Sequence, residues 1–358
     1  MYKVSIEPHW RIAYGNNAAM DTAMLLRLLS AIQTEGAILQ AAKTVHLSYR
    51  HAWGMLREAE TIFGGELLKK QRGRGTRLTH LATTLLWADK RIAARLSPTL
   101  ESLSSELEIE LSKSMMTERN NVRLIARHGF AVEELVRRLN AEGLPIELRY
   151  LSSTGAVTAL ARQECDLAGF RIPLGEFEAE TIARYSPWLD PERHCLIHLA
   201  VMNQGLLIAH GNPKGIHALT DLTRPDIRFV NRQAGSGTRI LLETLLARAG
   251  IAKESINGFQ TEEFTHSAIA AYIASGMANA GFGVETAARQ FNLDFIPLVR
   301  ERYFFAAEKE ALRRAPLRNV LDILQSDDFR ERVSHLIGYD ATDTGRVLTL
   351  ETAFQPRP

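Results

Sequence analysis

Cysteine and long apolar runs are scarce in this sequence. Only two of its 358 residues are cysteine, Cys165 and Cys195, which excludes a disulfide framework. Both stand among apolar residues, so we expect them to be buried. No run of about 20 uncharged apolar residues is present, which excludes a membrane-spanning helix. The opening residues, MYKVSIEPHW, lack the basic start and apolar core of a secretion signal, and we expect a cytoplasmic protein.

Net charge is also small, but it is unevenly distributed. The chain has 43 basic and 41 acidic residues, which leaves a formal charge of +2. The run KKQRGRGTR at residues 69–77 carries five basic residues and no acidic one. Its glycines indicate a loop or a hairpin tip, which is either solvated or in contact with a polyanion. The length allows two or more domains with cores of their own.

Three helical stretches precede this basic run. The first, MDTAMLLRLLSAIQTEG, places apolar residues on one helical face and ends at Gly36. The second, AILQAAKTVHL, is short, and its alanines allow a close helix approach. The third, SYRHAWGMLREAETIF, starts at the plausible N-cap Ser48. Its two faces separate an apolar set, Tyr49, Ala52, Trp53, Leu56, Ala59 and Phe63, from a polar set, Arg50, His51 and Arg57.

Three helices followed by a basic hairpin are typical of a winged helix-turn-helix, which we expect over residues 1–79. The stretches GAILQAAKTVHLSYRHAWGML and GGELLKKQRGRGTRLTH resemble the DNA-binding domains of LysR-type and, more closely, molybdate-responsive ModE-type regulators. We expect Arg50 or His51 to reach base edges, and the hairpin to hold phosphates. The candidate DNA contacts are Ser48, Arg50, His51, Arg57, Lys69, Lys70, Arg72 and Arg74. A solvated helix face and loop are the alternative.

A long helical segment, expected over residues 80–116, follows. Apolar residues recur from Leu78 to Leu107 at spacings near three and four, which predicts a helix with an apolar seam. Pro98 is expected to kink or break it. The seam could pack on the chain's own domains. Pairing with another copy is favoured, because a homodimer or homotetramer can read a palindromic operator in double-stranded DNA.

The second half of the chain alternates strand-like and helix-like stretches, which predicts an α/β fold. We place a two-lobed α/β domain at residues 121–345, with a C-terminal tail at 346–358. The apolar run HCLIHLAVMNQGLLIA is long enough to cross between lobes. Two lobes joined by crossing strands are the plan of periplasmic-type binding proteins, which hold a ligand in the cleft.

Specific stretches carry a second resemblance. LSSTGAVTALARQECDLAGFRI, FVNRQAGSGTRILLE and FTHSAIAAYIASGMANAGFG are similar to the periplasmic-binding-protein-like domain that is often fused to ModE-like or LysR-like DNA-binding domains. The chain departs from that family at Asn279, where aspartate is common, and at Phe170 or Arg171, where histidine is frequent. The resemblance implies an effector site, with molybdate or tungstate as its ligand.

Three glycine- or hydroxyl-rich segments are expected to open helices directly after strands: RHGF, SSTG and GSGT. The free N–H groups and the dipole of a helix start favour an anion. GSGT is not a phosphate-binding P-loop, because the lysine and the glycine spacing are missing. The candidate ligand contacts are Arg127, His128, Ser152, Ser153, Thr154, Gly235, Ser236, Gly237, Thr238, Thr265 and His266. We expect Arg239 only to pair with Glu243.

Neither a metal site nor a catalytic site is indicated. His194 and His198 lie in a strand-like run, where four residues span ~13 Å, so they cannot share an ion. Ser236 has no expected base beside it. Two hypotheses remain. The chain is a one-component DNA-binding regulator without cofactor, which senses molybdate, tungstate or formate and controls molybdenum-enzyme or formate dehydrogenase genes. Alternatively, it is a molybdenum-cofactor-handling enzyme or carrier with a nucleic-acid-binding N-terminal domain.

Overall fold

The computed structural model describes residues 3–13, 19–71, 75–114 and 121–355, with no side-chain description at 70, 71 and 112–114. The candidate residues Arg72 and Arg74, and the side chain of Lys70, lie outside this description. The chain divides into two compact units, of which one comprises Glu7–Leu96 and the other comprises the rest. Among the described residues, no helix has the length and apolarity needed to span a bilayer.

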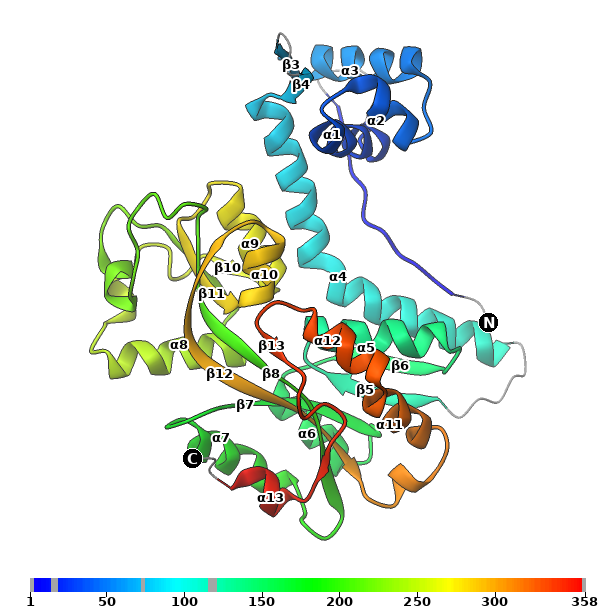
Figure 1. The fold of residues 1–358 in the computed structure, drawn as a ribbon, viewed down its shortest axis with the longest axis vertical. Coiled ribbons are helices and arrows are strands. Elements are labelled where there is room, and N and C mark those ends of the chain that lie inside the picture. The colour runs from blue at the N-terminus through cyan, green and yellow to red at the C-terminus, as the bar shows by residue number, and fades with distance from the viewer. Residues whose placement is uncertain (1–2, 14–18, 72–74, 115–120, 356–358) are drawn as a thin grey trace. The chain divides into compact units, whose positions relative to one another are not determined.

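The N-terminal unit contains helices α1, α2 and α3, the first part of the long helix that follows them, and two small antiparallel strand pairs (Figure 1). Its elements are β1 (Arg11–Ile12), β2 (Met20–Asp21), α1 (Ala23–Glu35), α2 (Ile38–Thr44), α3 (Tyr49–Phe63), β3 (Leu68–Gln71) and β4 (Gly75–Leu78). The apolar face of α1 is buried against α2 and α3, with Leu25, Leu28 and Ile32 fully covered. Gly36 ends α1 in a left-handed conformation at φ 68°, as its position in the sequence predicts.

The third helix begins where the sequence indicates. The Ser48 hydroxyl caps α3 by accepting a hydrogen bond from the His51 amide, 3.2 Å away. Ala52, Leu56 and Ala59 are buried, as expected of the apolar face. Tyr49 is an exception, since 46% of it is exposed. It occupies the first turn of α3, outside the part of the helix that packs on α1.

The sequence predicts a kink or a break at Pro98. Helix α4 (His80–Ser114) continues through this proline, so the break is wrong. A proline removes one N–H donor, and the other hydrogen bonds of a 35-residue helix suffice to carry it past that point. The expected apolar seam is covered only in part. Leu81 and Leu85 pack on the N-terminal core, whereas Leu96, Leu103 and Leu107 are 38%, 46% and 40% exposed.

The C-terminal unit is built on one mixed sheet in the order β10-β9-β11-β8-β12-β7-β5-β6, with β13 and β14 added along β8. Its strands are β5 (Val122–Ala126), β6 (Ile146–Tyr150), β7 (Leu167–Pro173), β8 (His194–Ile208), β9 (Phe229–Arg232), β10 (Glu262–Glu263), β11 (Ala280–Val284), β12 (Asp294–Glu308), β13 (Tyr339–Asp340) and β14 (Val347–Leu348). The parallel sets β6-β5-β7 and β10-β9-β11 form the two lobes.

The two lobes share two long antiparallel strands, β8 and β12, each of 15 residues. One part of β12 pairs with β7 of the first lobe, and one part of β8 pairs with β11 of the second. The run HCLIHLAVMNQGLLI therefore crosses between lobes, as its length predicts (Figure 1). Both strands are almost entirely buried where they pass through the first lobe.

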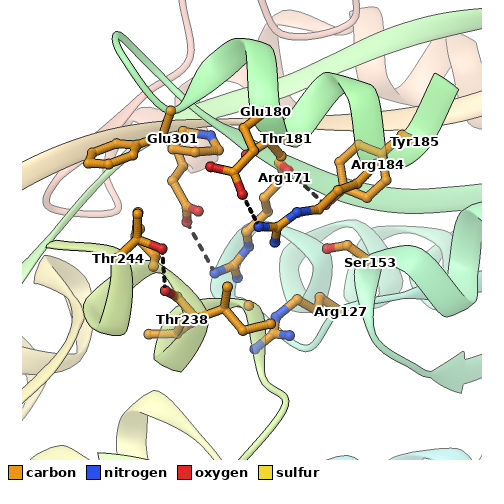
Figure 2. A pocket seen from close by; sticks show the side chains of 15 residues that line it. Arg127, Ser153, Arg171, Glu180, Thr181, Arg184, Tyr185, Thr238, Thr244 and Glu301 are labelled. Atoms are coloured by element: carbon orange, nitrogen blue, oxygen red, sulfur yellow. Dashed lines mark hydrogen bonds and ion pairs between the residues drawn. The ribbon is translucent and has the colours of Figure 1, made fainter. Parts of the chain in front are cut away.

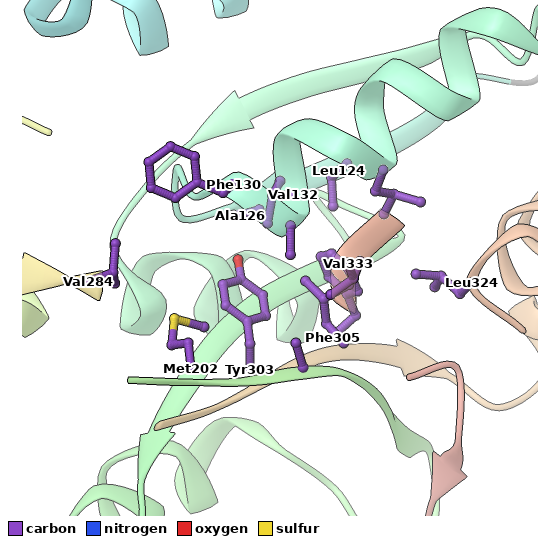
Figure 3. Packing of buried hydrophobic residues seen from close by; sticks show 14 of the residues in the cluster. Leu124, Ala126, Phe130, Val132, Met202, Val284, Tyr303, Phe305, Leu324 and Val333 are labelled. Carbon is purple, nitrogen blue, oxygen red and sulfur yellow. The ribbon is translucent and has the colours of Figure 1, made fainter. Parts of the chain in front are cut away.

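Helices cover both parts of the sheet. They are α5 (Phe130–Ala141), α6 (Ser153–Ala161), α7 (Glu178–Tyr185), α8 (Gly237–Arg248), α9 (His266–Ala274), α10 (Glu285–Gln290), α11 (Leu317–Gln325), α12 (Asp327–Ser334) and α13 (Leu350–Phe354). Figure 3 shows how Tyr303, Phe305 and Met202 of the crossing strands meet Val132 of α5 and Val333 near the C-terminal end of α12. This packing fixes α5, and with it the loop that precedes α5.

The segment predicted as a C-terminal tail packs on the first lobe. β14 pairs with β8, and Leu348, Leu350 and Ala353 are buried in the cluster that contains Phe170 and Phe304. The tail is therefore a part of the C-terminal unit's core over its described residues.

Candidate functional site

A polar cavity of about 70 Å³ lies between the two lobes of the C-terminal unit (Figure 2). It is lined by residues of α6, α7 and α8, by β7 and β12, and by the loop between β5 and α5. The polar residues among them are Arg127, Ser153, Arg171, Glu180, Thr181, Arg184, Tyr185, Thr238, Thr244 and Glu301. A single water needs roughly 10–15 Å³ of such space, so the cavity has room for a small ligand of a few heavy atoms.

Arg127 is held in place through its backbone. It directly follows β5, and the Tyr303 hydroxyl of β12 accepts a hydrogen bond from its amide at 3.2 Å and donates one to its carbonyl at 3.3 Å. Gly169 makes room for this hydroxyl, since a Cβ there would lie 2.4 Å from it. The Arg127 side chain is 8% exposed and lines the cavity, with no ion pair to a described residue.

Arg171 is the second buried guanidinium at the cavity. Its Nη1 lies 3.7 Å from Oε2 of Glu301, and its Nη2 donates to the His128 carbonyl at 3.4 Å. The Gln204 amide also donates to Oε2 of Glu301, which fixes this carboxylate. Glu301 therefore neutralises Arg171, and among the described residues no carboxylate forms an ion pair with Arg127.

A third buried guanidinium, that of Arg232, lies close enough to repel the other two. Burial, followed by the charges of Arg127 and Arg171, lowers the pKa of Arg232 well below its ordinary value. Burial and the charge of Arg171 lower the pKa of Arg127 to about 10. With a pKa of about 10, Arg127 remains charged near neutral pH, and its shift costs the folded chain on the order of 3 kcal/mol. Glu301 pairs with Arg171, and the guanidinium groups of Arg127 and Arg232 form no ion pair with a described residue.

Two helix starts add neutral donors. The Ser236 hydroxyl caps α8 by accepting from the Arg239 amide at 3.2 Å, and the Ser152 hydroxyl caps α6 by accepting from Gly155 at 3.1 Å. The next residues, Gly237 and Thr238 on α8 and Ser153 on α6, face the cavity. Helix amides in the first turn have no intrahelical acceptor. The Thr238 hydroxyl is buried and makes no hydrogen bond to a described residue.

The structure separates the predicted ligand residues into two groups. Arg127, Ser153, Gly237 and Thr238 line the cavity. The others lie outside its lining: Ser152 and Ser236 are caps, Thr154 and Gly235 are exposed, Thr265 caps α9, and His128 and His266 are directed elsewhere. Gly235 has φ 75°, so its role is to form the turn before α8. Arg239 pairs with Glu243 at 3.1 Å, as predicted, but it also pairs with Glu262 and donates to Gln260 at 3.1 Å, so Glu243 is not its sole partner.

His266 is buried next to the three arginines. It is 3% exposed, and neither ring nitrogen makes a hydrogen bond within the described part of the chain. Burial, and then the charges of Arg232, Arg171 and Arg127, lower its pKa well below 6.5. The imidazole is therefore neutral at pH 7 and adds no charge to the cluster.

Sequence reasoning missed Arg232, Glu301 and Tyr185, and it noted Arg171 only as a departure from a family pattern. A signal was present, because Arg171, Arg232 and Glu301 interrupt strand-like apolar runs. A charged residue in a buried strand needs a partner or a ligand. Which of these strands meet near one cavity depends on the sheet order, which the local sequence does not contain.

The predicted DNA contacts lie in the N-terminal unit. Arg50, His51 and Arg57 are exposed on α3, and Lys69 is exposed on β3. The Arg57 guanidinium lies 5.1 Å from the centre of the Trp53 ring, and Trp53 packs against the N-terminal core. Ser48 is occupied as the cap of α3.

No group of three or more potential metal-ligating side chains is found in the described part of the chain. His194 and His198 are both buried in β8. The two cysteines are free and buried, as expected, and burial raises the pKa of both thiols.

Residues 134–325, more than half of the chain, match the PBP superfamily domain. The chain therefore belongs to the PBP superfamily, and the expected two-lobed α/β domain of this type is confirmed. The uncharacterized protein YvgK of Bacillus subtilis (strain 168) is 35% identical over 208 residues, which are 57% of this chain and 65% of that protein. The match thus spans just under two thirds of YvgK.

A second relative, an uncharacterized protein in the ferredoxin 2Fe-2S gene 5′ region of Clostridium pasteurianum, is 37% identical over 111 residues. These are 31% of this chain and 98% of that protein. Among solved structures, an H2O2-bound mutant of Corynebacterium glutamicum OxyR is similar, with a TM-score of 0.42 and 16% identity. The similarity covers 86% of this chain and 92% of that one. A likeness this weak does not establish a shared function.

Because the buried guanidinium of Arg232 is repelled by those of Arg127 and Arg171, we expect Arg232→Met to stabilise the protein in the absence of a bound anion. Methionine has a similar length, and replacing a buried charge by an apolar group of similar size commonly adds about 1–4 kcal/mol. The measurement is the free energy of unfolding in urea, in a buffer free of multivalent anions. Arg162→Met, at an exposed position directly after α6, is the control and should change stability by less than about 0.5 kcal/mol. Strong destabilisation by Arg232→Met would mean that the guanidinium has a counter-charge.

The lowered pKa of His266 predicts a loss of stability in mild acid. The unfolded chain takes up a proton below pH 6.5 and the folded chain does not, so stability is complete above pH 6.5 and falls as the pH decreases below it. One such group contributes up to about 1.4 kcal/mol per pH unit. His266→Gln should flatten the dependence between pH 6.5 and 5, whereas His335→Gln, at an exposed position, should leave it unchanged. Equal slopes in both variants would contradict the assignment.

Proposed function

We propose that this chain is a one-component, DNA-binding transcription regulator whose C-terminal unit senses a small oxyanion. The observation that carries the proposal is the cavity between the lobes. Three buried arginines lie at or beside it, of which Arg171 pairs with Glu301, and Thr238 offers a buried hydroxyl that bonds to no described residue. Such a site is complementary to an anion of about two negative charges.

The size of the cavity narrows the ligand class. Its 70 Å³ suits a few heavy atoms, whereas sites for drug-sized ligands commonly have volumes of about 300–1,000 Å³. A molybdopterin-type cofactor is therefore not favoured, and with it the cofactor-handling alternative. Molybdate or tungstate fits the guanidinium groups of Arg127 and Arg232 best, and formate remains the smaller candidate. The regulated genes would be those of molybdenum enzymes or formate dehydrogenase.

The N-terminal unit supports the DNA-binding part of the proposal. α2 and α3 are joined by a short turn, and α3 exposes three basic or imidazole side chains, Arg50, His51 and Arg57. The β3–β4 pair follows, with Lys69 exposed. We infer a winged helix-turn-helix, in which α3 enters the major groove and the β3–β4 hairpin contacts phosphates. Tyr49, exposed at the start of α3, is an additional contact candidate.

We further propose that two or four copies assemble through α4. Leu103 and Leu107 are exposed on this helix one turn apart, and such a stripe is typical of a helix that pairs with a copy of itself. A twofold assembly presents two winged helices to a palindromic operator.

The ligand proposal predicts a selective thermal shift. At ~100 times its dissociation constant, the true ligand stabilises the protein by about 2.7 kcal/mol. Molybdate and tungstate should raise the melting temperature of the full chain more than nitrate or formate. Thr238→Val removes only the cavity hydroxyl and should reduce the shift, whereas Thr220→Val, at an exposed site, should retain it. A shift with formate alone would make the ligand a carboxylate. No shift with any anion would contradict the site.

The DNA-binding proposal predicts a change in salt dependence. Each phosphate contact contributes roughly 0.9 to the slope of log affinity against log salt. Replacing Lys69, Lys70, Arg72 and Arg74 together by alanine should lower affinity for all duplexes and reduce that slope by about 3. The control is Lys253→Ala, at an exposed position of the C-terminal unit. An unchanged slope in the quadruple variant would remove the hairpin from the interface.

A further inference from the structure

A continuous set of polar contacts joins the ligand cavity to helix α4. At its centre is His128, whose Nε2 lies 3.0 Å from Oε1 of Glu133 on α5 and 3.9 Å from Oε1 of Glu101 on α4. The imidazole also packs edge-on against Tyr150 of β6, with ring centres 5.1 Å apart. Its side chain is only 17% exposed, so these contacts are shielded from solvent on most sides.

On the cavity side, His128 follows Arg127 in the same short loop. Its carbonyl accepts the hydrogen bond from Nη2 of Arg171, the guanidinium that Glu301 holds at the cavity. The Tyr303 hydroxyl holds the backbone of Arg127. A ligand that attracts these two guanidinium groups therefore acts on the backbone of His128 in two ways. It acts through Arg127, the preceding residue in the chain, and through Arg171, which donates to the His128 carbonyl.

On the helix side, Glu101 is fixed by two hydroxyl groups. Ser97 donates to its Oε1 at 2.6 Å, and Tyr150 donates to its Oε2 at 2.7 Å. Burial raises the pKa of this carboxyl group, but the nearby His128 and the hydrogen bonds from Ser97 and Tyr150 outweigh burial, so the pKa lies below its ordinary value. Glu101 is thus ionised at neutral pH, and its Oε1 lies 3.9 Å from the imidazole Nε2.

One turn further on, α4 is fastened to the sheet. The Ser105 hydroxyl donates to the Ile146 carbonyl at 3.1 Å and accepts from the Leu148 amide at 2.9 Å, both on β6. This contact does not reach the loop that carries Arg127 and His128. The contact between Glu101 and His128, in contrast, links α4 to the loop that lines the cavity.

We propose that the His128–Glu101 contact couples anion binding to the position of α4. Anion binding repositions Arg127 and Arg171, the loop moves with them, and the imidazole changes its distance from Glu101. Because α4 runs without interruption from His80 to Ser114, a change in its attachment at Glu101 acts along the helix toward the N-terminal unit. This inference rests on the proposed regulator function and adds to it the residue pair that carries the signal. His128 and Glu101 are positioning residues, and neither lines the cavity.

The test compares Glu101→Gln with Glu106→Gln in the full chain. Glutamine at 101 keeps the size and the hydrogen-bonding ability of glutamate and removes the negative charge beside His128. Glu106 is exposed on the same helix, so its variant controls for the loss of one charge. The readout is the dissociation constant for an operator duplex, selected with the wild-type chain from random sequences, with and without molybdate. The converse readout is the molybdate affinity with and without that duplex.

Coupling between two sites is reciprocal, so both readouts should give the same factor, typically about 5–150-fold. We expect the wild-type chain and Glu106→Gln to share this factor, and Glu101→Gln to fall below about twofold. Molybdate affinity without DNA and the melting temperature should stay close to those of the wild-type chain, which a general structural defect would not allow. His128→Asn provides a second variant with the same expected loss, should Glu101→Gln fail to fold.

The outcomes separate the two proposals. If molybdate does not change DNA affinity in the wild-type chain, the proposed function fails and the coupling inference fails with it. If the wild-type chain shows coupling and both Glu101→Gln and His128→Asn retain the full factor, the regulator stands and the coupling inference is overturned.

Discussion

The antiparallel pairing of β8 with β12 determines where the groups of the ligand cavity lie. Both strands pass through the two lobes, so the register of this pair sets the position of one lobe's sheet against the other. β12 supplies Tyr303, which holds the backbone of Arg127, and Glu301, which pairs with Arg171. β8 supplies Gln204, which fixes Glu301. A site made of residues from sequence positions 127 to 301 is thereby held on two rigid strands.

The charges at this site oppose folding and favour binding. Of three buried guanidinium groups, that of Arg171 pairs with Glu301, the other two form no ion pair with a described residue, and burial lowers the pKa of Arg127 and Arg232. In an empty cavity their repulsion is uncompensated, and an anion removes it. A protein that retains such a cluster gives up stability in order to bind, as is common at functional sites. The α8 start adds donors without further charge, because Gly237 and Thr238 line the cavity and the amides of a first helical turn have no intrahelical acceptor.

Local features of the fold could be predicted from the sequence, and long-range ones could not. Ser48, Ser152 and Ser236 cap the helices that their spacing indicates, because a cap depends on only a few neighbouring residues. The alternation of strands and helices likewise predicted the α/β class. The sequence does not predict in the same way which distant residues come together. Arg171 and Arg232 come together only through the order of strands in the sheet, and His128 turns toward Glu101 because α4 packs beside β6. Pro98 shows the opposite error, since a local rule predicted a kink or a break and the long helix does not break there.

The central claim is that the cavity between the lobes binds a compact, doubly charged oxyanion. The most direct measurement is X-ray diffraction from crystals of the full chain grown with tungstate, with data collected at a tungsten absorption edge. The account predicts a strong anomalous peak in the cavity, in contact with the side chains of Arg127 and Arg171 and with the first turn of α8. Tungsten only at surface sites, with that cavity unoccupied, would contradict it.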